Sequence, residues 1–350
     1  MAERILIIKP SSLGDVVTAL PLVGDLRRVM PGVEIDWFLH PGLRGVVEGH
    51  KGVSGIVEFD RKKLGAWWWR PTAFAGLVGL IRKLRRRRYD VVIDAQGLLR
   101  SALFTRLTGA PVRVGFADAR EGAPVAYTHK VWLPEGGKKM LAVERMRALG
   151  KPLGTDVGVA AEFGVPVAAL TGEAARVEEL GEYVVMIPGA RWDTKRWPVE
   201  RFAEVARRLA GQGEGLVLMG SAGEKGLCDR IETEVGGGAR VVNLAGKTGV
   251  REMVAVIARA RLVIGNDSGP LHVATALGVR VVGLYGPTDP AFVGPYGQME
   301  NVIRHEVPCF PCRNKTCGHH SCMQGVTVEL VWEKAKGMLP AGTGGEEKGR

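Results

Sequence analysis

The sequence predicts an α/β protein of two doubly wound domains, each a parallel sheet with helices on both faces. Three observations support this fold class. Short apolar runs alternate with longer amphipathic stretches along most of the chain, which is typical of parallel sheets. The pattern restarts midway: residues 5–10 form an apolar run and a turn, as do residues 184–189. The length of 350 residues suits two domains at roughly 150 residues each.

The individual elements follow from the apolar periodicity. We expect strands at residues 5–8, 91–93, 184–187, 216–219, 262–264 and 281–284, and helices at 16–29, 199–210 and 251–260. Residues 151–175 are rich in Gly, Ala, Val and Pro without strand alternation, so we place the linker there. The predicted domains are therefore residues 1–165 and 176–340. The Gly/Glu/Lys tail, 341–350, is expected to be disordered.

The chain is basic, with 48 Lys and Arg against 37 Asp and Glu and a net charge of +11. Such a surplus favours anionic partners such as nucleotides, phosphorylated lipids, nucleic acids or membrane surfaces. The longest uncharged apolar stretch, 71–81, is too short to span a bilayer. The N-terminus does not resemble a signal peptide. We therefore expect a cytoplasmic protein.

Two segments of the first half combine positive charge with aromatic residues: RKKLGAWWWR at 61–70 and RKLRRRR at 82–88. One interpretation is a solvated basic face beside a helix. The other is a cationic, Trp-anchored surface for a phosphate-rich membrane interface. Three consecutive Trp residues cannot all face one core, which favours the membrane interpretation.

The first strand runs into the turn KPSSLGDVV at residues 9–17, which opens a helix. Such a turn presents backbone N–H groups and the positive end of a helix dipole. Asp15 is the candidate catalytic carboxylate, with Gly14 allowing a close backbone approach. The alternative is that Ser12 or Asp15 only caps the helix.

Three strand-end loops of the second half predict a site for a nucleotide diphosphate. The segment 188–198, PGARWDTKRWP, offers Arg191, Lys195 and Arg196 to phosphate. The sequence Asp267-Ser268-Gly269 precedes a helix containing His272, and YGPTDP follows at 285–290. A helix N-terminus beside a hydroxyl suits an anion. Ordinary turn chemistry would use the same residue types, so the prediction depends on the three loops together.

Two nucleotide-binding signatures are incomplete. Gly246-Lys-Thr resembles the end of a P-loop, but Val241 occupies the position of the first required glycine. No G-x-G-x-x-G opens the first helix, which argues against a dinucleotide-dependent dehydrogenase.

Four of the five cysteines are clustered as C-x2-C-x4-C-x4-C, at Cys309, Cys312, Cys317 and Cys322, with His319 and His320 between them. Thiolates at this spacing could hold structural zinc or an iron–sulfur cluster. The alternative is a set of reduced thiols. Cys228 stands apart and is expected to be buried.

Together these motifs resemble the heptosyltransferases of lipopolysaccharide core assembly, in glycosyltransferase family nine. The matching segments are IIKPSSLGDVVTALP at 7–21, DVVIDAQGLLRSAL at 90–103, DARE at 118–121, AVER at 142–145, KRWP at 195–198, NDSGPLH at 266–272 and YGPTDP at 285–290. The first half looks most like the enzyme that adds the first heptose. The cysteine cluster with GHH is more like the enzyme that adds the second.

The resemblance implies a GT-B fold, an ADP-heptose donor, inversion at the anomeric carbon and no metal in the chemistry. The acceptor would be lipid A bearing 3-deoxy-octulosonate, reached by a peripheral protein on the inner face of the inner membrane. The first domain would bind the acceptor and the second the nucleotide sugar. Ala190 and Arg191 stand where relatives carry hydroxyl residues, so Arg191 would supply charge instead.

The implied roles are as follows. Asp15 would be the base; Arg191, Lys195, Glu224, Asp267, Ser268, Gly269 and His272 would bind the donor; Ser12, Gly14, Arg61, Lys62, Lys63, Gln96 and Arg120 would bind the acceptor.

Rival functions remain at this point. Within the family, the chain could be the second heptosyltransferase or another transferase with a different sugar or acceptor. A nucleic-acid-binding protein would also be basic, but its aromatic residues are expected along a groove within a recognised module. A metal-dependent redox protein would use the cysteine cluster.

Overall fold

The structure is a computed structural model that describes residues 2–65, 68–137 and 140–340. The chain divides into two compact units, Met1–Pro166 and Val167–Arg350, and each is described by itself. The boundary falls within the segment 151–175, where the sequence placed a linker. The tail 341–350 lies outside the described residues. Among the described helices, none has the length and apolar character needed to cross a membrane.

The first unit is built on six parallel strands in the order β3-β2-β1-β4-β5-β6. The chain reverses its direction of winding between β1 and β4, which pair directly. Ligands of such sheets bind outside the carboxyl ends of the strands at this switch point. The strands are β1 (Arg4–Ile8), β2 (Glu34–Leu39), β3 (Gly55–Glu58), β4 (Val91–Asp94), β5 (Val112–Phe116) and β6 (His129–Val131).

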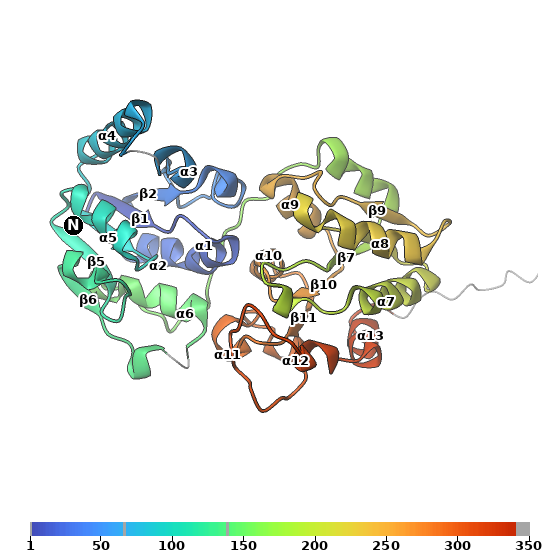
Figure 1. Cartoon of the computed structure of the whole chain (residues 1–350). Coiled ribbons are helices and arrows are strands. Elements are labelled where there is room, and N and C mark those ends of the chain that lie inside the picture. The colour runs from blue at the N-terminus through green and yellow to red at the C-terminus, as the bar shows by residue number, and fades with distance from the viewer. Residues whose placement is uncertain (1, 66–67, 138–139, 341–350) are drawn as a thin grey trace, which may run out of the picture. The chain divides into compact units, whose positions relative to one another are not determined.

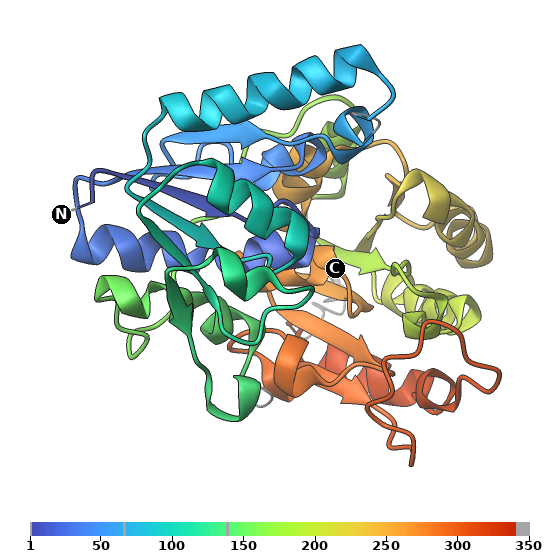
Figure 2. The same ribbon diagram turned by 60° about the vertical axis from the view of Figure 1, so that its left-hand side comes forward.

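Helices cover both faces of this sheet (Figures 1 and 2). One face packs Leu6 and Phe38 against Leu84 and Phe104 of the covering helices, because alternate strand residues point to one side. That face carries α3 (Arg61–Leu64), α4 (Pro71–Arg86) and α5 (Leu99–Leu107), and the other carries α1 (Leu13–Ala19), α2 (Pro21–Val29) and α6 (Ala142–Arg147). The prediction of one helix at 16–29 was wrong: the chain forms two helices, and Pro21 begins the second because proline lacks the N–H that would continue the first.

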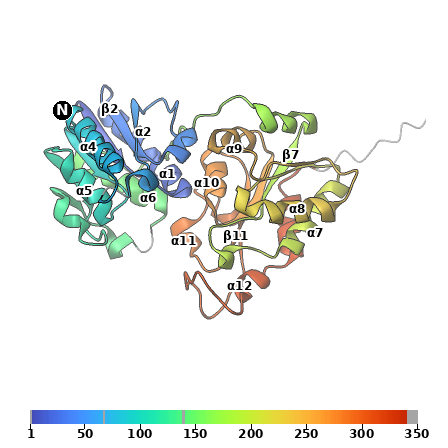
Figure 3. The same ribbon diagram turned by 45° about the horizontal axis from the view of Figure 1, so that its top comes forward.

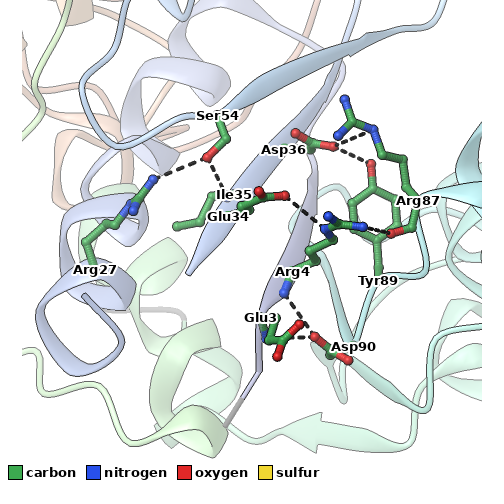
Figure 4. A network of polar contacts seen from close by, with 10 residues as sticks. All are labelled: Glu3, Arg4, Arg27, Glu34, Ile35, Asp36, Ser54, Arg87, Tyr89 and Asp90. Atoms are coloured by element: carbon green, nitrogen blue, oxygen red, sulfur yellow. Dashed lines mark hydrogen bonds and ion pairs between the residues drawn. The ribbon is translucent and has the colours of Figure 1, made fainter. Parts of the chain in front are cut away.

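Polar side chains join the strands towards the amino edge of this sheet, away from the strand ends where ligands bind (Figure 4). The Tyr89 hydroxyl donates to Asp36 Oδ2 at 2.6 Å. Asp90 Oδ2 accepts from the backbone N–H of Glu3 at 2.7 Å and of Arg4 at 2.9 Å. Burial and Asp36 raise the pKa of Tyr89, so its hydroxyl stays a donor. These bonds tie β1, β2 and β4 together.

The second unit repeats the winding, with parallel strands in the order β12-β11-β10-β7-β8-β9. Its switch point lies between β7 and β10, which pair directly. The two doubly wound parallel sheets confirm the predicted fold class. The strands are β7 (Tyr183–Ile187), β8 (Gly215–Leu218), β9 (Val241–Asn243), β10 (Leu262–Asn266), β11 (Val281–Tyr285) and β12 (Val302–Arg304).

The second sheet is also covered on both faces (Figures 1 and 3). Phe202, Ile231 and Val331 of three helices pack on one face with Met186 and Ile264 of the strands. Those helices are α7 (Val199–Gly211), α8 (Lys225–Val235) and α13 (Val328–Lys336). The helices α9 (Val250–Ile257) and α10 (Gly269–Ala276) pack together. The helices α11 (Pro290–Val293) and α12 (Ser321–Gln324) are short. The remaining turns are 3-10 helices at Pro41–Val46, Ala123–Ala126, Pro134–Gly137, Ala148–Leu153, Gly172–Leu180, Asp193–Lys195, Ala222–Glu224 and Met299–Asn301.

Candidate active site

Asp15 lies in the first turn of α1, directly after the carboxyl end of β1. Its Oδ2 accepts hydrogen bonds from the Ser12 hydroxyl at 2.6 Å and from the Ser12 backbone N–H at 3.0 Å. The Asp15 side chain is 53% exposed. These bonds fix the direction of the carboxylate and leave it open to solvent. Asp15 therefore helps to cap α1 and remains a candidate for the catalytic base.

A buried lysine stands behind Asp15. Lys9 is only 5% exposed, and its Nζ lies 3.8 Å from Asp15 Oδ1. Burial lowers the pKa of Lys9, and the nearby Asp15 and Asp94 carboxylates oppose that shift. Sequence reasoning missed Lys9 as a site residue, although a lysine directly after a wholly apolar strand was an available signal.

Asp94, the other carboxylate at this switch point, is occupied by structural bonds. Its Oδ1 accepts from the backbone N–H groups of Gln96 and Gly97 at 3.0 and 2.9 Å. Its Oδ2 accepts from the hydroxyls of Ser101 and Tyr127 at 2.9 and 2.7 Å. Burial raises the pKa of Asp94, but four donors already satisfy the group. Asp94 therefore shapes the loop after β4, and Asp15 is the better candidate base.

A cavity of about 320 Å³ opens beside the Asp15 turn within the first unit. Its floor contains Phe38, Phe59 and Phe104, whose ring centroids lie 5.0–5.1 Å apart. Its polar lining is contributed by Ser11, His40, Arg61, Gln96, Arg100, Ser101 and Glu121. The Gln96 Oε1 atom is buried and has no hydrogen-bond partner within the described part of the chain. The cavity thus offers two guanidinium groups and an unsatisfied acceptor above an apolar floor.

The other predicted acceptor residues lie around this cavity in different ways. Ser12 and Gly14 belong to the turn that holds Asp15. Lys62 and Lys63 are exposed on α3, whose first turn is capped by Asp60. Arg120 is exposed and does not line the cavity. His40 and Arg100, which do line it, were not singled out from the sequence.

The second unit brings the predicted donor residues Lys195, Asp267 and His272 together. Lys195 Nζ lies 2.6 Å from Asp267 Oδ2, and His272 Nε2 lies 3.8 Å from Asp267 Oδ1. The Thr288 hydroxyl also donates to Asp267 Oδ2, at 2.6 Å. Burial alone would raise the pKa of Asp267, but His272 and Lys195 lower it to about 2. The buried Asp267 carboxylate is therefore fixed by its neighbours, and it holds the Lys195 ammonium at the carboxyl ends of the strands.

Ser268 and Gly269 stand at the start of α10, beside this cluster. Ser268 is the N-cap residue, and its buried Oγ has no hydrogen-bond partner among the described residues. A helix N-terminus is electropositive and suits a phosphate. An unsatisfied hydroxyl beside a helix N-terminus is expected of a site that binds an anion.

Glu224 reaches the carboxyl end of β7. A Cβ atom on Gly189, just beyond that strand, would lie 2.2 Å from the Glu224 carboxyl carbon, so only glycine permits this approach. The Ser221 hydroxyl and backbone N–H hold Glu224 Oε2 at 2.7 and 2.8 Å. Arg191 is exposed in the neighbouring loop, and no ion pair involves it among the residues that the structure describes.

Sequence reasoning also missed how the donor loops are held. Asn266, at the end of β10, donates from Nδ2 to the Pro188 carbonyl at 2.8 Å and accepts from the Trp197 backbone N–H at 3.0 Å. Thr288 fixes the third loop through Asp267. The quoted motifs contained both residues, but a side-chain bond between loops has no signature in the sequence.

The cysteines do not assemble the metal site that their spacing suggested. Within the described part of the chain, no group of three or more His, Cys, Asp or Glu side chains is placed to hold a metal ion. Cys309 is exposed while Cys322 is buried, and burial raises the pKa of the Cys322 thiol. Cys309, Cys312 and Cys317 lie near enough to add to that pKa shift, but the four thiols are not placed to hold zinc or an iron–sulfur cluster. Cys228 is buried, as expected.

Two doubly wound units, one with an exposed carboxylate at its strand ends and one with a lysine and a helix N-terminus there, are compatible with a transferase of nucleotide-linked groups. The chain belongs to glycosyltransferase family 9 (heptosyltransferase), whose family model matches residues 77–322. It is therefore a glycosyltransferase.

The chain is similar to named heptosyltransferases over most of its length. It is 33% identical to lipopolysaccharide heptosyltransferase 1 of Pseudomonas aeruginosa, with 90% of this chain and 87% of that protein covered. It is 28% identical to lipopolysaccharide heptosyltransferase 2 of Escherichia coli, with 96% and 98% covered. The structure of E. coli heptosyltransferase WaaC with ADP matches with a TM-score of 0.79 at 28% identity, covering 96% of this chain and all of that one. These likenesses agree with the GT-B architecture that the sequence resemblance implied.

Proposed function

We propose that this protein transfers heptose from ADP-heptose to the 3-deoxy-octulosonate of a lipid A-linked acceptor, with inversion at the anomeric carbon, in lipopolysaccharide core synthesis. The observation that carries the donor half is the Lys195–Asp267–His272 cluster beside the unsatisfied Ser268 hydroxyl. The relatives named above are heptosyltransferases, and one solved relative carries ADP.

The two units would divide the substrates between them. The first unit would bind the acceptor, because its cavity carries Arg61 and Arg100 over an aromatic floor. Cationic guanidinium groups suit the carboxylates of an acidic sugar, and aromatic rings suit the C–H faces of a sugar ring. The second unit would bind the nucleotide sugar, with Lys195, Arg191, Ser268 and the start of α10 around the diphosphate.

The chemistry needs one base and a stabilised leaving group. Asp15 would take the proton of the acceptor hydroxyl as that oxygen attacks the anomeric carbon. The bond between the anomeric carbon and the diphosphate oxygen breaks on the opposite face, and its electron pair leaves with ADP. Inversion follows from this single displacement.

We propose that the reaction uses no cofactor. The charge that develops on the departing diphosphate would be met by the Lys195 ammonium and by the N-terminus of α10. Lys195 is only 17% exposed and is held by Asp267, so it is already in place before the charge develops.

Sequence identity favours transfer of the first core heptose over the second, since the chain is 33% identical to a heptosyltransferase 1 and 28% identical to a heptosyltransferase 2. The cysteine segment pointed to the second-heptose enzyme on sequence alone.

A binding experiment tests the donor directly: the protein should gain more thermal stability with ADP-heptose than with UDP-glucose. At 100 times its dissociation constant a ligand stabilises by about 2.7 kcal/mol. A larger shift with the uridine nucleotide would contradict the proposed donor.

We also propose that α3 and the start of α4 form a peripheral membrane surface on the cytoplasmic side of the inner membrane. Trp68 and Trp69 are 68% and 61% exposed, and Phe74 is 51% exposed. Trp67 lies outside the described residues. The nearby cations Lys62 and Lys63 are exposed, and such a pairing of aromatic anchors with basic residues suits an anionic lipid surface.

A further inference from the structure

The cysteine-rich segment lies against two loops of the donor cluster. The Arg313 backbone N–H donates to the Pro287 carbonyl at 2.9 Å, and the Thr194 hydroxyl donates to the Asn314 carbonyl at 2.7 Å. Thr194 precedes Lys195, and Pro287 precedes Thr288. We call residues 309–317 the strap. It is pinned at two adjacent residues, one to each loop that contacts Asp267.

These anchors place Lys315 beside the ring that also carries Lys195. Lys315 Nζ lies 5.6 Å from the centroid of the Trp192 ring, and Lys195 Nζ lies 4.8 Å from it. The ammonium groups of Lys195 and Lys315 therefore both lie near the Trp192 ring. The arrangement comes from two segments more than a hundred residues apart in the sequence.

The two lysines differ in their neutralisation. Lys195 is paired with Asp267 at 2.6 Å. Lys315 is exposed and has no carboxylate within ion-pair distance in the part of the chain that the structure describes. Arg313 is occupied otherwise, since its guanidinium carbon lies 5.0 Å from the centroid of the Phe292 ring. Lys315 thus adds an uncompensated positive charge beside the donor cluster.

An anion that contacts both cations is attracted by each of them. The ligand of this cluster would carry two adjacent phosphates. We propose that Lys315 is a second phosphate-binding cation of the donor site, supplied by the strap, and that it binds the diphosphate of the nucleotide sugar together with Lys195. This inference rests on the proposed donor and assigns to the cysteine-rich segment a role that needs no metal.

The test is the affinity for ADP measured by isothermal titration. Lys315→Ala should raise the Kd for ADP about tenfold, as expected for loss of one charged hydrogen bond. It should change the Kd for AMP much less, because AMP lacks the second phosphate. Lys315→Arg should keep most of the affinity. Lys336→Ala, which removes an exposed lysine at the end of α13, is the matched control and should bind ADP like the wild type.

A second variant tests the strap as the support of Lys315. Thr194→Val removes the hydroxyl that holds the Asn314 carbonyl, so it should weaken ADP binding as well. Combined with Lys315→Ala it should add little, because both changes remove the same contact. Full additivity of the two losses would contradict the role of the strap.

The outcomes separate this inference from the proposed function. If the wild type binds ADP, Lys195→Ala weakens binding and Lys315→Ala does not, the inference about Lys315 is overturned and the donor site stands. If the wild type does not bind ADP at all, both the donor assignment and the role of Lys315 are overturned.

Discussion

Asp15 Oδ2 accepts two hydrogen bonds from Ser12, one from the hydroxyl at 2.6 Å and one from the backbone N–H at 3.0 Å. The Asp15 carboxylate, in the first turn of α1, is thereby held in one direction beyond the end of β1. A base must be positioned before it can accept a proton in the transition state. The cap therefore supplies the orientation that the proposed chemistry requires.

Replacing Asp15 by Asn should lower turnover by about 10²–10⁴-fold, the usual contribution of a positioned base. The Asn side-chain oxygen can still accept from Ser12, so the fold should be retained. Affinity for ADP should stay unchanged, because the donor is assigned to the other unit. Steady-state kinetics with circular dichroism checks this, and Glu34→Gln, at the amino edge of the sheet, is the control. Near-normal turnover in a folded Asp15→Asn protein would remove Asp15 from the mechanism.

Lys195→Ala should weaken ADP binding about 10- to 100-fold, since a charged hydrogen bond contributes roughly 1.5–3 kcal/mol. The substitution also leaves the buried Asp267 carboxylate without its lysine, so thermal stability should fall. Titration calorimetry and a melting curve measure the two effects separately. Unchanged affinity for ADP would show that Lys195 lies outside the donor site.

Asp267 should make stability depend on pH in the acid range. His272 and Lys195 outweigh the effect of burial and hold its pKa at about 2, below the ordinary value of 3.8 for an aspartate. A lowered carboxyl pKa stabilises the fold above the unfolded value, and this contribution is lost as pH falls from about 4 through about 2. The shift corresponds to about 2 kcal/mol. Denaturant unfolding at a series of pH values should show the difference between wild type and Asp267→Asn shrinking over that window. A difference that is constant with pH would contradict the assignment.

Binding to anionic vesicles should depend on both the aromatic and the basic parts of the proposed membrane surface. Trp68→Ser with Trp69→Ser should reduce co-sedimentation, and so should Lys62→Gln with Lys63→Gln. Binding should also weaken as salt rises, because exposed charges are screened. Trp132→Ser is the matched control, since Trp132 is 79% exposed elsewhere on the same unit. Equal binding to neutral and anionic vesicles would contradict the proposal.

The sequence predicted the strands with apolar runs, β1, β4, β7, β8, β10 and β11, and the strand-end loops, because both depend on local patterns. It did not predict β2, β3, β5, β6, β9 and β12, which are short or contain polar residues. An apolar run marks β1 or β7, and Asp15, Lys195 and Asp267 lie in the segments that follow such runs. Thr288 was missed because its role depends on Asp267, which only the tertiary fold brings near. Lys9, which directly follows an apolar strand, could have been found from the sequence. The cysteine spacing suggested a metal site that the geometry does not support, since spacing along the chain does not fix how thiols are arranged.

The most direct test of the central claim is transfer itself. The purified protein is incubated with ADP-heptose and, in separate reactions, with lipid A bearing 3-deoxy-octulosonate alone or already carrying one heptose. Mass spectrometry of the lipid products is the readout. We expect addition of one heptose to the heptose-free acceptor with release of ADP, and little addition to the acceptor that already carries heptose. Transfer only to the heptose-bearing acceptor, or no transfer to either while ADP-heptose binds, would contradict the proposed function.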